Sequence, residues 1–124
     1  MFKLLLMFLF VAVMLPSEPA ELMTPAELAA QVKLYQQAKK SGDLPAIINN
    51  SSFAIQRAWA YNNAGYALIK GTHTRQDLVD AKILFLMALE EAAQVNIPRH
   101  LKEKDTVTRV ANNNLEYCLN RLNR

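Results

Sequence analysis

Small residues recur at helical spacing in the middle of the chain, and they constrain its fold more than any other feature. Over positions 53–71 and again over 74–96, apolar residues return with the period of an α-helix. Gly65 falls on the apolar stripe of the first segment, and Ala81 and Ala88 fall on that of the second. Because residues without bulk let helices approach closely, the spacing predicts two adjacent antiparallel helices that meet at these three positions.

Capping residues mark both ends of a helix nearer the N-terminus. Thr24 precedes Pro25 and stands three residues before Glu27, the order of an N-cap, a proline at the first helical position and a capping-box glutamate. Gly42 is expected to end the helix, because glycine readily takes the left-handed conformation found just beyond helix ends. We therefore expect a helix over 25–41.

Further boundaries complete an all-α prediction. Ser51 or Ser52 is expected to cap the second helix, and Thr74 with Asp77 forms a capping-box variant at the start of the third. A last helix is expected within 102–122. The chain of 124 residues has only three Gly and is 52% hydrophobic, a composition that favours helices. We expect about four helices, with the central antiparallel hairpin flanked by capping helices.

The N-terminus has the pattern of a secretory signal peptide. Residues 4–15 are apolar and uncharged, follow a lysine, and precede a short polar stretch. This predicts a signal peptide over 1–20 and a helical domain over 24–124. Cleavage after Ala20 would place Glu18 where a small residue is usual, so an uncleaved membrane anchor stays open as an alternative. Twelve residues of helix span about 18 Å against a hydrocarbon core of about 30 Å, which disfavours a stable transmembrane span.

Charge and cysteine content narrow the class of protein. The formal net charge is +3, and the basic residues near the C-terminus alternate with acidic ones, which indicates a solvated helical face and not a nucleic-acid partner. Cys118 is the only cysteine, so no intrachain disulfide forms, and it is expected to be a buried apolar residue. An exported domain held by packing alone favours a bacterial periplasmic or secreted protein.

Neither a catalytic nor a metal site is predicted. His73 and His100 fall in expected loops or helix ends, without a nearby cysteine or a pair of carboxylates. The carboxylates of the third helix are expected to be helix-start and surface charges: Asp77, Asp80, Glu90 and Glu91. We therefore expect a protein that is not an enzyme and needs no cofactor.

Seven positions of the central segments resemble a known repeat. They are Tyr61, Ala64, Gly65, Leu68, Ala81, Phe85 and Ala88. Their order is similar to the signature of the tetratricopeptide repeats, and the spacing from Gly65 to Ala81 is that of the Sel1-like members. Gly71 and Asp77 also stand where a Sel1-like repeat has Gly and Asp, although His73 replaces its second loop glycine.

A second, partial copy follows in the last helix. Residues 112–115 echo residues 62–65, with Leu115 in the place of the small Gly65. The resemblance thus covers one clear repeat and part of another. It implies stacked helix pairs that leave a groove lined by the first helix of each pair, a surface that commonly holds a peptide or a partner helix.

The resemblance implies eight groove-facing candidates. They are Trp59, Asn62, Tyr66, Ile69, Lys70, Arg109, Asn112 and Glu116. In this interpretation Asn62 pairs with a peptide backbone, the two aromatic residues supply rigid apolar contact, and Lys70 meets a carboxylate. The alternative is that Trp59 and Tyr66 are ordinary core aromatics and Asn62 a polar residue of the helix.

The expected function is that of an exported, non-catalytic protein-protein interaction module or scaffold with a protein or peptide partner. A face of the third helix, formed by Val79, Ile83 and Leu86, is a candidate for that contact or for homo-oligomerisation. Two alternatives stay open: a small secreted helical inhibitor or effector, and a membrane-tethered assembly factor that keeps its N-terminal anchor. A membrane is a partner only in the second of these.

Overall fold

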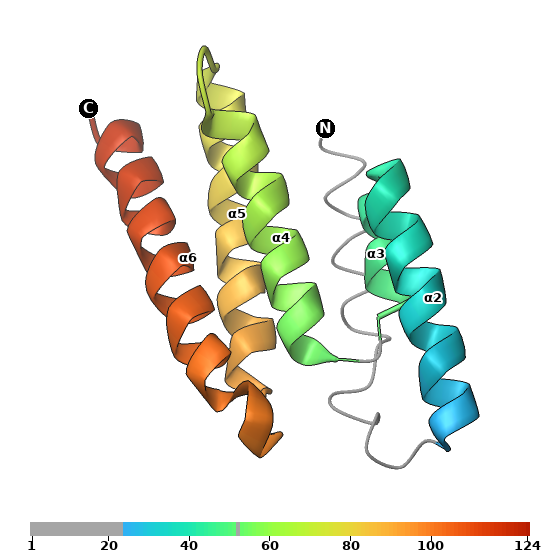
Figure 1. The fold of residues 1–124 in the computed structure, drawn as a ribbon. Coiled ribbons are helices and arrows are strands. Elements are labelled where there is room, and N and C mark those ends of the chain that lie inside the picture. The colour runs from blue at the N-terminus through green and yellow to red at the C-terminus, as the bar shows by residue number, and fades with distance from the viewer. Residues whose placement is uncertain (1–23, 52) are drawn as a thin grey trace.

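A computed structural model describes residues 24–51 and 53–124, and these residues are all-helical (Figure 1). The elements are α2 (Pro25–Ser41), α3 (Leu44–Asn49), α4 (Ala54–Ile69), α5 (Arg75–Ala93), the short 3-10 turn η2 (Pro98–His100) and α6 (Leu101–Leu122). The predicted all-α class is confirmed. The predicted signal peptide over 1–20 lies outside the described residues.

The helices alternate in direction along the chain. In Figure 1, α2, α4 and α6 run one way, while α3 and α5 run back between them. α5 packs against both α4 and α6, and α3 joins α2 to α4. None of the helices in the described part of the chain combines the length and hydropathy needed to cross a membrane.

Local capping explains where two of the helices begin. The Thr24 hydroxyl accepts a hydrogen bond from the Glu27 backbone N–H at 3.2 Å, and α2 ends at Gly42 with φ 73°. Thr74 and Asp77 form both bonds of a capping box at the start of α5. These boundaries are confirmed.

The start of α4 differs from the prediction. Its N-cap is Phe53, which makes no side-chain capping bond, so Ser51 is not the cap. The Ser51 hydroxyl instead lies 3.0 Å from the Phe53 carbonyl oxygen and 2.8 Å from Gln56 Oε1, in a buried turn that precedes the helix. The other candidate, Ser52, lies outside the described residues.

The contact between α4 and α5 is close because one glycine makes room for one aromatic ring. A Cβ placed on Gly65 would lie 2.7 Å from Phe85 Cε1, which is shorter than atoms of this kind tolerate. The Phe85 ring is fully buried, as are Ala81 and Ala88 on the same helix. The three small positions therefore lie in the packed interior, with Gly65 in direct contact with α5.

α6 packs along α5 and also contacts α4. Val107, Ala111 and Cys118 are fully buried on this helix, and burial raises the pKa of the Cys118 thiol. Of the predicted contact face on α5, Val79 and Ile83 are half-buried and Leu86 is 47% exposed. α5 is thus enclosed on two sides, which accounts for its nearly continuous apolar surface.

The Gly65→Ala substitution tests the close contact. Overpacking lowers the free energy of unfolding by about 1–3 kcal/mol, whereas the better helix propensity of alanine raises it by at most about 1 kcal/mol. Because the added methyl group would lie 2.7 Å from the buried Phe85 ring, we expect a net loss of about 1–2 kcal/mol in the free energy of unfolding. Urea unfolding followed by far-UV circular dichroism measures it.

Phe85→Leu provides the matched control, since a shorter side chain leaves room for the added methyl group. The double variant is expected to lose less stability than the sum of the two single variants. Additive losses, or a Gly65→Ala protein more stable than the parent, would contradict the packing described.

Candidate functional site

A pocket of about 660 Å³ lies among α2, α4 and the beginning of α6. Its walls carry both ring and polar groups: Tyr35, Lys39, Gln56, Trp59, Asn63 and Glu103. Apolar side chains from the α3 segment and from the start of α4 complete the lining, among them Ile47, Phe53 and Ile55. The pocket therefore combines aromatic, aliphatic and charged surface, the mixture typical of ligand and peptide sites.

Trp59 and Glu103 connect two helices at this pocket. The indole Nε1 of Trp59 donates a hydrogen bond to Glu103 Oε1 at 2.9 Å, across 44 residues of sequence. Glu103 lies in the first turn of α6, where the helix dipole favours a negative charge. The bond holds the carboxylate in a defined position at the pocket, and Trp59 itself is half-buried against the core.

Tyr35 brings α2 to the same pocket. Its side chain is buried, and burial raises the pKa of the phenol, with the negative charge of Glu103 adding to the rise. Lys39 follows one turn later and is exposed. His100 completes the charged and titratable lining, and its ring packs edge-on against Phe53 with 5.0 Å between ring centroids.

The structure uses two of the predicted groove residues to hold helices together. Asn62 is buried, and its side-chain oxygen accepts a hydrogen bond from Asn114 Nδ2 at 3.0 Å, which links α4 to α6. Ile69 is buried in a cluster with Phe85 and Cys118. Neither side chain is on the surface that a partner would meet.

Two other candidates on α4 are exposed. Tyr66 is 52% exposed, and Lys70 follows it as an exposed residue at the end of the helix. Trp59 precedes them by seven and eleven residues, so all three share one face at about 3.6 residues per turn. The pocket is thus continued along α4 by an exposed face that ends in a positive charge.

The candidates on α6 lie elsewhere on that helix. They are all exposed: Arg109, Asn112 and Glu116. At 3.6 residues per turn, each stands about 140° to 160° around the helix axis from Asn114, the residue that reaches α4. The structure therefore does not bring them together with Trp59, Tyr66 and Lys70.

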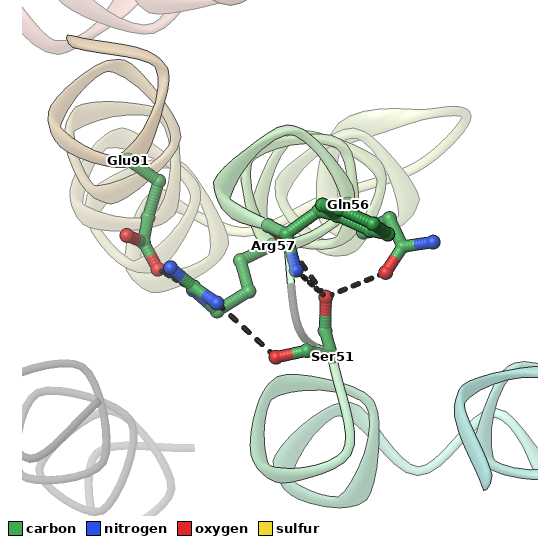
Figure 2. A network of polar contacts seen from close by, with 5 residues as sticks. Ser51, Gln56, Arg57 and Glu91 are labelled. Atoms are coloured by element: carbon green, nitrogen blue, oxygen red, sulfur yellow. Dashed lines mark hydrogen bonds and ion pairs between the residues drawn. The ribbon is translucent and has the colours of Figure 1, made fainter. Parts of the chain in front are cut away.

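A buried ion pair joins α4 to α5, as Figure 2 shows. Arg57 Nε lies 2.7 Å from Glu91 Oε2, and both side chains are almost fully buried. Arg57 Nη1 also donates to the Ser51 carbonyl oxygen at 3.1 Å. This network fixes the end of α5 and the turn before α4 to each other.

Two of the surface charges expected on α5 are in fact buried, so that prediction is wrong for them. Glu91 pairs with Arg57, and Asp80 accepts a hydrogen bond from Gln76 Nε2 at 3.0 Å. Burial, and then the charge of Glu91, raises the pKa of the Tyr61 phenol nearby. The burial of Glu91 could have been predicted from its position, because it lies three residues after Ala88 and so falls on the apolar stripe of the helix.

The histidines do not form a metal site. Over residues 24–51 and 53–124, no group of three or more His, Cys, Asp or Glu side chains is arranged to hold a metal ion. His73 Nδ1 lies 2.9 Å from the Gly71 carbonyl oxygen, and its ring meets the Tyr117 ring at 6.2 Å between centroids. These contacts are structural.

Comparison with known proteins gives no match to a family model, to a curated protein or to a solved structure. The geometry of the pocket and of the α4 face is therefore the basis for the functional argument.

Adjacent glutamates provide a test of the buried pair. Glu91→Gln removes the carboxylate that pairs with the buried Arg57 side chain, and breaking such a pair costs about 3–5 kcal/mol. Glu90 is exposed, so Glu90→Gln is expected to change the free energy of unfolding by less than about 0.5 kcal/mol. Equal effects of the two substitutions in urea unfolding would contradict the placement of Glu91.

Proposed function

We propose that this protein is an exported, non-catalytic interaction module of the tetratricopeptide or Sel1-like type, in which α2, α4 and α6 act as the first helices of successive pairs. The observation that carries the proposal is the pocket of about 660 Å³ that is lined by residues from these three helices. In repeats of this kind the first helices line the groove that receives a partner.

The order of helices supports this assignment. α2 with α3 and α4 with α5 are antiparallel neighbours, and α6 follows in the direction of α2 and α4 (Figure 1). The signature residues Gly65 and Phe85 are in direct contact at the centre of the second pair. A small residue facing an aromatic ring is what allows the paired helices of such repeats to approach.

The partner is proposed to be a protein segment that lies along the exposed face of α4. Trp59 at the pocket and Tyr66 further along supply large, amphipathic surface, and aromatic residues of this kind dominate binding energies at interfaces. Lys70 adds a charge at the end of this face. Asn62 is excluded from contact because it already pairs with Asn114.

The binding surface is tested with two double variants of the tagged, exported protein. Tyr66→Ala with Lys70→Glu is expected to weaken capture of its partner from the native compartment about tenfold or more, since two contact residues are lost. Arg109→Ala with Glu116→Ala, on the other side of α6, is the control and is expected to capture normally. Partner loss in the control, or none in the first variant, would count against this surface.

We propose export because residues 1–20 have the pattern of a signal peptide. A separate experiment tests it. The mass of the protein recovered from outside the cytoplasm is expected to be smaller than that of the full chain by about twenty residues, the usual length of a signal peptide. Full-length mass in the membrane fraction would instead favour the tethered assembly factor. Recovery in the cytoplasm alone would overturn both.

A further inference from the structure

We infer that the pocket among α2, α4 and α6 binds a positively charged side chain, lysine or arginine, presented by the protein partner. This inference rests on the proposed function and adds the chemistry of the partner to it. It follows from three groups that converge on the pocket from three different helices: Tyr35, Trp59 and Glu103.

The carboxylate of Glu103 is already positioned for a cation. Glu103 is exposed, and its Oε1 accepts the indole hydrogen bond of Trp59 at 2.9 Å, which restricts the carboxylate before a ligand arrives. Carboxylates form their strongest hydrogen bonds with ammonium and guanidinium groups.

The aromatic lining favours the same sign of charge. Tyrosine and tryptophan rings attract cations through their negative faces, by about 0.5–2 kcal/mol per contact. Tyr35 and Trp59 both line the pocket, so a cation bound there lies near two aromatic side chains. An anionic ligand would face both rings and the carboxylate unfavourably.

The remaining titratable groups do not cancel this preference. Lys39 lines the pocket but is exposed on a flexible stem, and within the described part of the chain no ion pair joins it to Glu103. His100 packs edge-on against the Phe53 ring, and its buried Nδ1 makes no hydrogen bond within the part of the chain that the structure describes. Gln56 and Asn63 add neutral amides, which can hydrogen-bond a guanidinium group or a peptide backbone.

The size of the pocket agrees with a side chain and part of its backbone. Sites for small ligands usually occupy about 300–1,000 Å³, and this pocket has about 660 Å³. A lysine or arginine can place its apolar stem against Ile47 and Ile55 while its charged end reaches Glu103. The mixed lining therefore matches an amphipathic cation.

Trp59 is the only tryptophan of the chain, so its fluorescence reports directly on the pocket. The exported protein is titrated with the Nα-acetyl amides of lysine, arginine, norleucine and glutamate, and with tetramethylammonium. Saturable changes are expected with the lysine and arginine amides, and none with the norleucine or glutamate amides. Binding of the glutamate amide in place of the cations, or of tetramethylammonium alone, would overturn the inference.

Charge variants complete the test. Glu103→Gln is expected to weaken binding of the lysine amide about tenfold, whereas Glu116→Gln, an exposed change on the same helix with the same loss of charge, leaves it unchanged. Lys39→Gln is expected to strengthen binding, because it removes a like charge. Equal weakening by both glutamate variants, or loss of binding in Lys39→Gln, would contradict the inference.

Failure of the cation pocket can be distinguished from failure of the proposed function. Absence of binding by every amide, together with partner capture that depends on Tyr66 and Lys70, would reject the cation pocket and leave the interaction surface in place. Far-UV circular dichroism of each variant shows that it remains folded.

Discussion

The contact of Gly65 with Phe85 is the constraint on which the other features depend. The aromatic ring occupies the space that a Cβ at position 65 would need, so α4 and α5 lie against each other at short range. That distance lets Arg57 on α4 reach Glu91 on α5 at 2.7 Å, in a setting where two buried charges tolerate little displacement. α6 then packs against α5 and also contacts α4.

The pocket follows from the same arrangement. Because α6 is positioned by α5, its first turn places Glu103 within hydrogen-bond distance of Trp59 on α4. α2 reaches the pocket with Tyr35, although it is held to α4 mainly through the short α3. A rigid pair of helices therefore forms one wall, and a more lightly attached helix forms the other. Such a wall can adjust to a ligand at low cost in stability.

Local signals in the sequence were sufficient for most of the fold. Capping contacts join residues that are close in sequence, so the helix ends that they mark could be predicted. This holds for Thr24, for Gly42 and for the pair Thr74 and Asp77. Contacts between residues far apart in the sequence could not be predicted in this way. The Trp59 to Glu103 bond spans 44 residues, and a buried glutamate such as Glu91 resembles a surface charge until the position of Arg57 is known. Ser51 was misassigned because its hydroxyl serves the preceding turn.

Nuclear Overhauser contacts in solution measure directly whether α4 and α5 touch through Gly65 and Phe85. If the two helices pack as described, strong cross-peaks are expected between the Gly65 α-protons and the ring protons of Phe85, with those α-protons shifted upfield by the ring. Absence of these cross-peaks, with the Phe85 ring contacting other residues instead, would contradict the close packing of α4 on α5.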